Sequence, residues 1–171
     1  MSPTNASTNA SSARPSPAEV SRRLDRAEAL CAARGAQLTA LRREVLELLL
    51  LRHGSAKAYD LQDDLRQRHG RVAPTTVYRA LEFLMEQQLV HRVDTLNCFV
   101  VCNLDPQPHD HPHEHTMMLV CSRCGQVTEV HDPAATEAIG RALQTDAPGF
   151  RAMDIEIKGL CAACQSAPAS S

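Results

Sequence analysis

Aromatic residues are scarce in this chain of 171 residues, which has no Trp, two Tyr and three Phe. Proteins that bind single-stranded nucleic acid stack the bases on aromatic side chains, so the composition does not favour that function. The sequence also lacks a run of about 18 uncharged apolar residues, so we expect no membrane-spanning helix and no membrane partner. The first 17 residues have no apolar segment, and we expect no secretory signal peptide there.

The chain has no strong charge of either sign, with a formal net charge of −2. This total conceals two unlike halves, because residues 1–95 carry 14 Lys and Arg against 11 Asp and Glu, whereas residues 96–171 carry 4 against 9. A length of 171 residues suits two small domains. An odd number of cysteines without a secretory signal favours a reducing compartment, and we expect a cytoplasmic protein whose Cys-x-x-Cys pairs bind metal.

Helical periodicity and helix-boundary residues predict four helices in the basic half. The first has an N-cap, a Pro and a Glu in its opening turn, and the third ends at a Gly. The second, third and fourth predicted helices are short, and a Pro precedes the last of them, which is typical of a helix-turn-helix. The predicted helices begin after Ser16 and end at Gly35, begin after Thr39 and end at Gly54, run from Ala58 to His69, and run from Thr75 to Gln87.

The fourth predicted helix has one apolar face and one polar face. At 100° per residue its apolar residues gather on one side, and Thr75, Thr76, Arg79 and Glu86 lie opposite. Arg and Thr near the start of an exposed helix are residues that read base edges and phosphates in DNA. The residues expected to face inward are Val77, Ala80, Leu81, Leu84 and Met85.

Two β-rich runs follow this helix, at residues 89–93 and 98–102, with a turn over residues 94–97. A hairpin directly after the last helix of a helix-turn-helix is the wing of a winged helix. We therefore expect a winged helix-turn-helix DNA-binding domain over residues 17–102, after a disordered tail over residues 1–16.

The acidic half predicts a second, smaller domain. Residues 103–115 are rich in Pro, Asp and His and indicate a linker. Strands are expected over residues 116–120, 126–131 and 150–157, and a helix from Pro133 to Asp146 with Ile139 and Leu143 facing inward. The fold class is thus α+β, with a small α/β domain over residues 116–165 and a disordered tail over 166–171. A domain of this size needs a metal or a partner subunit for stability.

Two Cys-x-x-Cys pairs, Cys121 with Cys124 and Cys161 with Cys164, stand 36 residues apart. The two-residue spacing lets both thiolates of a pair bind one ion, and Gly125 lets the backbone turn after the first pair. Four thiolates in a tetrahedron are typical of a closed structural zinc site. The alternatives are a pair of thiol–disulfide motifs or free thiols in the core, but a redox Cys-x-x-Cys usually occurs once in a chain.

A second group of metal-ligand residues is dispersed between the two domains. His91 and Cys102 lie on opposite strands of the predicted wing, and His115 and Glu129 belong to the second domain. An ion bound by both pairs would fix how the domains are oriented. Surface histidines and a solvated His-rich loop explain the same pattern without a metal. The remaining candidate ligands are Cys98, His109, His111, His113 and His131.

Several of these segments resemble the ferric uptake regulator family. The resemblance covers about residues 18–165 and, within the family, is greatest to its zinc uptake regulator branch, which shares the Val-His-Arg-Val run at 90–93 and a Cys at 102. The other segments that carry it are Ala-Tyr-Asp-Leu at 58–61, Pro-Thr-Thr-Val-Tyr-Arg-Ala-Leu at 74–81, the His-rich stretch before Cys121, and Gly-Leu-Cys-x-x-Cys at 159–164.

The resemblance implies a homodimeric zinc-sensing repressor that binds a palindromic operator in double-stranded DNA and controls zinc uptake genes, with two Zn²⁺ ions per subunit. The second domain is then the dimerisation domain. The implied structural zinc ligands are Cys121, Cys124, Cys161 and Cys164. The implied sensing ligands are His91, Cys102, His115 and Glu129. The implied DNA-binding residues are Tyr59, Thr76, Tyr78 and Arg79.

The His-rich loop departs from the pattern of the branch, because it holds more His and its spacing to Cys121 differs. His113 is therefore an alternative to His115, and His109, His111 and His113 are a possible extra site. A regulator of the same family that senses iron, manganese or peroxide is the alternative function, but the thiolate of Cys102 favours zinc. A zinc enzyme would need an acid–base motif beside the metal, and the sequence has no His-Glu-x-x-His pattern.

Overall fold

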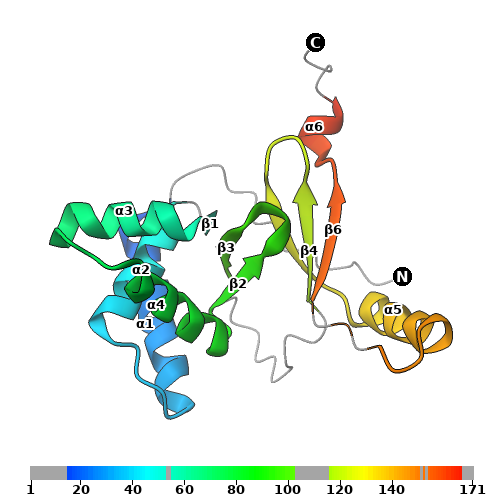
Figure 1. Cartoon of the computed structure of the whole chain (residues 1–171), viewed down its shortest axis with the longest axis horizontal. Coiled ribbons are helices and arrows are strands. Elements are labelled where there is room, and N and C mark those ends of the chain that lie inside the picture. Colours follow the sequence, from blue (N-terminus) through cyan, green and yellow to red (C-terminus); the bar gives the residue numbers. More distant parts are fainter. Residues whose placement is uncertain (1–14, 53–54, 103–115, 151, 153, 167–171) are drawn as a thin grey trace. The chain divides into compact units, whose positions relative to one another are not determined.

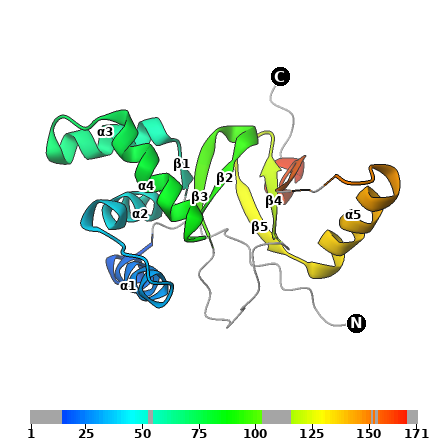
Figure 2. The same cartoon turned by 60° about the horizontal axis from the view of Figure 1, so that its bottom comes forward.

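The computed structural model describes residues 15–52, 55–102, 116–150, 152 and 154–166. Its contacts divide the chain into two compact units, shown in Figures 1 and 2. The N-terminal unit contains the described residues up to Cys102, and the C-terminal unit contains those from Thr116 onward. Among the described residues, no helix combines the length and the apolar character that crossing a bilayer requires.

The N-terminal unit contains four α-helices and three short strands, as expected for a winged helix. The helices are α1 (Pro17–Ala33), α2 (Ala40–Leu51), α3 (Ala58–His69) and α4 (Pro74–Glu86), and a 3₁₀ turn, η1, spans Asp94–Leu96. The strands are β1 (Ser55–Ala56), β2 (Val90–Val93) and β3 (Cys98–Val101). All four predicted helices are present. The predicted end of the second helix was wrong, because α2 stops at Leu51, and Gly54 lies outside the described residues.

The N-termini of the first two helices are built differently. The Ser16 hydroxyl accepts a hydrogen bond from the Glu19 N–H at 3.2 Å, as the sequence predicts. Thr39 occupies the N-cap position of α2, but its side chain makes no capping bond. The backbone carbonyl of Thr39 instead accepts from the Arg43 N–H at 2.9 Å, which closes the first turn.

Helix α4 buries the face that the helical periodicity selects. Val77, Ala80, Leu81 and Leu84 are buried, whereas Met85 is only half-buried. Phe83 is buried as well, although at 100° per residue it lies outside the predicted stripe, between Thr76 and Arg79. The Arg42 guanidinium stacks on the Phe83 ring, 3.5 Å from its centroid, so a neighbouring helix covers what periodicity leaves exposed.

Three strands form the antiparallel sheet of the wing, in the order β1-β3-β2. Strands β2 and β3 are the predicted hairpin, with Val90 opposite Val101 and Val93 opposite Cys98. Asn97 closes the turn at φ 49°, a left-handed conformation that Asn tolerates better than most residues. Strand β1 was not predicted, because two residues show no strand periodicity; Ser55 pairs with Val100.

The C-terminal unit is a three-stranded sheet with one long helix. It contains β4 (Thr116–Cys121), β5 (Val127–His131), α5 (Pro133–Asp146), β6 (Ile155–Gly159) and α6 (Ala162–Ser166). The strand order is β5-β4-β6, with β4 beside β6 in Figure 1 and beside β5 in Figure 2. Strand β4 is antiparallel to β5 and parallel to β6, and α5 connects β5 at one edge of the sheet to β6 at the other.

Three details of this unit differ from the sequence prediction. The last strand begins at Ile155 rather than at residue 150, since Gly149 has φ 85° and the Phe150 N–H closes a turn onto Ala147. Helix α6 was not predicted, and it extends to Ser166, into the expected tail. Ile139 and Leu143 are half-buried rather than buried.

A matched pair of substitutions on α2 tests the assignment of the core. Leu49 has no exposed surface, whereas Leu51 is 39% exposed. We expect Leu49→Ala to lower the free energy of unfolding by about 3 kcal/mol, because it removes contacts and leaves a cavity. Leu51→Ala should lower it by less than about 1 kcal/mol. Urea unfolding measures both values, and equal losses would contradict the burial assigned here.

Candidate metal centres and nucleic-acid interface

The two Cys-x-x-Cys pairs meet at one end of the C-terminal sheet. Cys121 ends β4, and the parallel register places it beside Gly159, which ends β6. The first pair turns back after Cys124 because Gly125 has φ 73°, a conformation that favours glycine. The second pair follows β6, with Cys164 in α6. Parallel pairing of β4 with β6 therefore brings together cysteines that are distant in sequence.

The four sulfur atoms are arranged to hold one metal ion. They all lie within 4.8 Å of one another, and the Sγ atoms of Cys124 and Cys161 are 3.8 Å apart. This separation is too long for a disulfide. It matches the edge of a tetrahedron about a zinc ion, which is about 3.8 Å for Zn–S bonds of about 2.3 Å. The residues present therefore fit the tetrahedral thiolate site that the sequence predicts.

Backbone N–H groups favour the thiolate at one of the four positions. The Cys161 N–H donates to the Cys121 sulfur at 3.4 Å and, with the Cys124 N–H, lowers the pKa of Cys121 to about 6. Hydrogen bonding to the Cys161 sulfur raises the pKa of Cys164 to about 12. The pKa of Cys124 is also raised, since the Gln126 N–H lowers it less than the Cys121 sulfur and burial raise it.

Arg123 is a residue of this site that the sequence did not single out. Its guanidinium, from inside the first Cys-x-x-Cys pair, donates a hydrogen bond to the backbone carbonyl of Cys164. The side chain thus ties the turn after β4 to α6, and it brings positive charge near four potential thiolates. Its position between two cysteines was the only signal in the sequence.

Two residues of the second predicted cluster lie together on the wing. Cys102 follows β3 and is buried, and His91 on β2 is half-buried. The Cys102 sulfur and a ring nitrogen of His91 lie within 4.8 Å of each other, so this hairpin offers a nitrogen and a sulfur donor to one ion. Glu129 lies on β5 in the C-terminal unit and is half-buried. The predicted ligands His109, His111, His113 and His115 lie outside the described residues.

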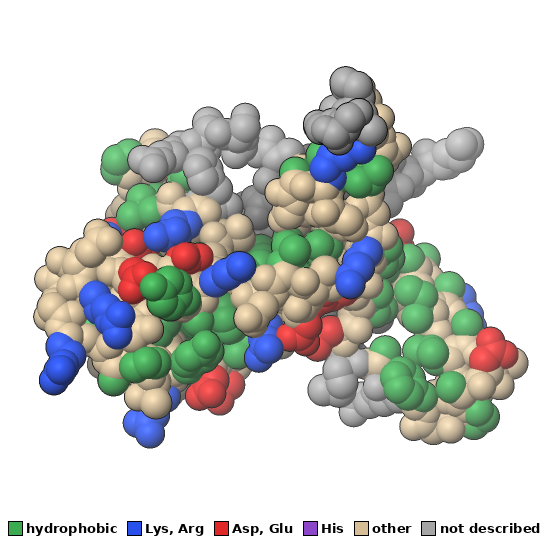
Figure 3. Space-filling view, turned by 45° about the horizontal axis from the view of Figure 1, so that its top comes forward, with side chains coloured by type: hydrophobic (Ala, Val, Ile, Leu, Met, Phe, Trp, Pro, Cys, Tyr) green, Lys and Arg blue, Asp and Glu red, His purple; other side chains and the backbone are tan. Residues whose placement is uncertain are grey.

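The predicted DNA-binding side chains lie near the starts of two helices. Tyr59 is the second residue of α3 and is 67% exposed, and Tyr78 in α4 is 51% exposed. Arg79 is exposed and Thr76 is half-buried. Within the described part of the chain, Arg79 makes no ion pair, so its charge is available to a partner. Basic side chains form separate patches among acidic ones on the face drawn in Figure 3.

No side chain caps the N-terminus of α4. Ala73 is its N-cap residue and Pro74 its first residue, and the structure has no side-chain hydrogen bond at this cap. The Thr76 N–H donates to the Ala73 carbonyl at 3.0 Å, and Pro74 has no N–H to offer. The exposed face of α4 combines hydroxyl, phenol and guanidinium groups.

These features define a winged-helix protein in which four cysteines are close enough to hold one metal ion. The family model that matches the chain, over residues 33–158, is the ferric uptake regulator family. The chain belongs to this family.

The chain is similar to two curated proteins of this kind. It is 43% identical to the zinc uptake regulation protein of Escherichia coli (strain K12) over 145 residues, which cover 82% of this chain and 80% of that protein. It is 34% identical to the zinc uptake regulation protein of Mycobacterium tuberculosis (strain ATCC 25618 / H37Rv) over 136 residues, which cover 78% and 98%.

Among solved structures, the chain is similar to a zinc uptake regulator complexed with zinc and DNA. The TM-score is 0.73 and the sequence identity 42%, and the match covers 85% of this chain and 95% of that one.

The pKa values predict how metal binding at the four-cysteine site depends on pH. Because the pKa values of Cys124 and Cys164 are raised, an ion must displace at least two protons at neutral pH. We expect the zinc affinity of this site to rise by at least about 100-fold per pH unit. It should fall more steeply with pH below about 6, where Cys121 is also protonated.

Competition with a chelator of known pH dependence measures this affinity. Cys31→Ser is the control, since Cys31 is buried in the N-terminal unit and should leave both the affinity and its slope unchanged. An affinity that stays constant from about pH 6.5 to 8 would exclude the proton displacement described here.

Proposed function

We propose that this protein is a zinc-responsive, DNA-binding transcriptional repressor that controls zinc uptake genes. The observation that carries the proposal is the pairing of Cys102 with His91 on the wing that follows α4. A thiolate with an imidazole is a donor pair that favours zinc over ferrous iron. The similarity to zinc uptake regulators supports the same metal. The protein is a regulator rather than an enzyme, and a repressor acts on the chromosome, hence in the cytoplasm.

In this proposal α4 is the recognition helix and reads the major groove of double-stranded DNA. Thr76 and Arg79 contact base edges or phosphates, and Tyr59 and Tyr78 contribute exposed side chains beside them. A dimer would place two such helices on a palindromic operator with the same two-fold symmetry. The solved zinc uptake regulator complexed with DNA supports this partner.

We further propose that each subunit binds two zinc ions with different roles. The first is structural and is held by the four cysteines, whose sulfur spacing supports it. The second is the sensing ion and is held by His91, Cys102, His115 and Glu129, with His113 as the alternative to His115. The extra histidines of the linker, His109 and His111, form a weaker additional site.

Sensing in this proposal works because the second ion binds residues of both units. His91 and Cys102 belong to the N-terminal unit, and Glu129 belongs to the C-terminal unit. An arrangement that offers all the donors binds zinc more tightly than one that separates them, so zinc increases the population of the first arrangement. The favoured arrangement is the one that binds the operator.

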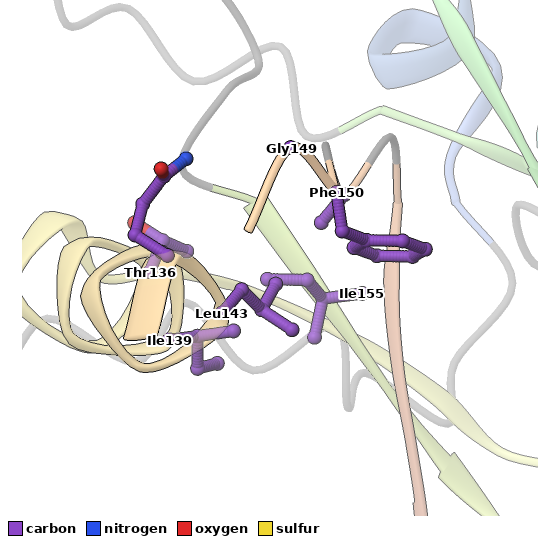
Figure 4. A pocket seen from close by; sticks show the side chains of 9 residues that line it. Thr136, Ile139, Leu143, Gly149, Phe150 and Ile155 are labelled. Atoms are coloured by element: carbon purple, nitrogen blue, oxygen red, sulfur yellow. The ribbon is translucent and has the colours of Figure 1, made fainter. Parts of the chain in front are cut away.

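Homodimerisation is supported by the apolar surface that the C-terminal unit leaves uncovered. Leu119 and Ile157, which are paired across β4 and β6, are 37% and 44% exposed, and Leu160 is 43% exposed. A hollow of about 320 Å³ lies beside α5, where Leu143 of the helix points toward Ile155 of β6 and Phe150 lies above them (Figure 4). A second copy of the chain would cover such a surface.

The sensing site is tested by Cys102→Ser. We expect this substitution to reduce the zinc-dependent gain in DNA affinity by about tenfold or more, because the sensing ion loses its thiolate. The probe is a DNA duplex that the zinc-loaded protein selects from a random pool, and fluorescence anisotropy measures its binding at controlled free zinc.

The matched control is Cys98→Ser, a buried cysteine at the start of β3, the strand that precedes Cys102, and it should keep the full zinc-dependent gain. Full retention of the gain in Cys102→Ser would show that the assigned sensing site is wrong. If the wild type binds the duplex equally well without the sensing ion, while the four-cysteine site stays loaded, the proposed function itself fails.

The dimer is tested by Ile157→Lys, which places a charge on the exposed apolar face. We expect this variant to sediment mainly as a monomer of about the chain mass, 18.7 kDa, at micromolar concentration, whereas the wild type sediments as a dimer. Ala138→Lys adds the same charge to the exposed side of α5 and should remain dimeric. An unchanged dimer in Ile157→Lys would place the interface elsewhere.

A further inference from the structure

The turn between α4 and β2 contains a residue in an unusual backbone conformation. Gln88 has φ 58°, in the left-handed region that residues with a Cβ rarely adopt. Two hydrogen bonds close the turn, from the Gln88 N–H to the Met85 carbonyl at 2.8 Å and from the Leu89 N–H to the Leu84 carbonyl at 2.9 Å. This pair of bonds is a Schellman motif, in which the left-handed residue is usually Gly.

Helix α1 ends with the same motif and does use Gly. Gly35 has φ 69°, its N–H bonds to the Ala32 carbonyl at 3.0 Å, and the Ala36 N–H bonds to the Cys31 carbonyl at 2.9 Å. The sequence therefore has the usual residue at one helix end and a disfavoured one at the other. A conformation that opposes the residue's own preference persists only where surrounding contacts hold it.

Besides the two backbone bonds that close its turn, the contacts at Gln88 come from Arg34, at the end of α1. Arg34 is the C-cap residue of α1, so the first Schellman motif fixes its backbone. Its guanidinium donates one hydrogen bond to the Gln87 carbonyl and a second, at 3.4 Å, to the Gln88 side-chain carbonyl Oε1. Glycine at position 88 would lack this acceptor. A cation at the C-terminus of α4 also interacts favourably with the helix dipole.

The same turn is bonded to the metal-ligand residues of the wing. Leu89 donates its N–H to α4, and its carbonyl accepts from the Cys102 N–H at 3.0 Å. His91 follows two residues after Leu89, on β2. One residue therefore joins the backbone of α4 to the backbone of a proposed zinc ligand, and Gln88 directly precedes it.

We propose that Arg34 and Gln88 form a latch that couples metal binding at His91 and Cys102 to the orientation of α4. Both are positioning residues, since neither is a ligand of the ion. While Arg34 is bonded to Gln87 and Gln88, the latch is closed, and α4 moves together with the wing as one body. When these bonds are broken, the latch is open, and a change in the backbone conformation of Gln88 absorbs the shift of the wing. The coupling to DNA rests on the proposed function, whereas the latch itself does not.

The first experiment uses Arg34→Met in the full chain and measures the ratio of DNA affinities with and without zinc. We expect this ratio to fall by about fivefold or more, while zinc stoichiometry and melting temperature stay unchanged. Gln88→Gly keeps the left-handed turn but removes the acceptor, and it should produce the same fall. The double variant should lose no more than either single one, because both remove one interaction.

The salt dependence of binding separates the latch from a direct DNA contact. If Arg34 touches a phosphate, Arg34→Met lowers affinity with and without zinc and reduces the slope of log affinity against log salt by about one. That result would overturn the proposal. The latch predicts an unchanged slope. Arg141→Met, which removes an exposed guanidinium from the C-terminal unit, controls for the loss of charge.

Hydrogen exchange tests the latch without reference to DNA or zinc sensing. In Arg34→Met the amides of Gln88 and Leu89 should exchange about tenfold faster than in the wild type, while amides in the middle of α4 are unchanged. Unchanged exchange at both amides would show that no latch exists. Faster exchange together with an unchanged ratio of DNA affinities with and without zinc would show that the latch exists but does not couple metal binding to the orientation of α4. A wild type without any zinc effect would overturn the proposed function and the coupling, and the exchange result would still decide the latch.

Discussion

The parallel pairing of β4 with β6 is the interaction on which the C-terminal unit depends. The continuous apolar core of the protein lies entirely between Val20 and Val101, in the N-terminal unit. The C-terminal unit has few buried side chains, and α5 buries only Thr136. A unit with so small a core needs additional constraints to be stable. The register of Cys121 with Gly159 supplies one, because it assembles a four-sulfur site whose metal would bind only the folded chain.

The N-terminal unit, by contrast, has an extensive apolar core. This core stabilises the unit, so other side chains can remain exposed to solvent. Helices α2 and α4 bury their leucines against each other, so α4 can leave Tyr78 and Arg79 to solvent without loss of stability. Arg42 on the Phe83 ring and Arg34 at the end of α4 fix the helix from two neighbours. The helix that we propose as the recognition helix thus packs against neighbouring helices on one face and is exposed to solvent on the other. The turn at Gln88 joins it to the wing.

The sequence predicted the elements whose signals are local. Helix α3 and α5 have the predicted bounds, because each is delimited by strong local signals: a Gly after His69, and Asp132 with Pro133 at the start of α5. The third strand of the C-terminal sheet was misplaced because its start depends on the turn at Gly149. The sites followed the same rule: the Cys-x-x-Cys spacing indicated a tetrahedral site, but Arg123 escaped notice because its partner is 41 residues away.

Residue types and their spacing by themselves determined the class of fold, the four candidate thiolate ligands and the face of α4 that is exposed, since each follows from periodicity or from a short motif. The tertiary structure decided which distant residues meet: Cys121 with Cys161, His91 with Cys102, and Arg34 with Gln88. These contacts depend on strand register and on helix packing, which are set by the whole chain. A local pattern specifies what a residue can do, and only the folded backbone specifies which partner it has.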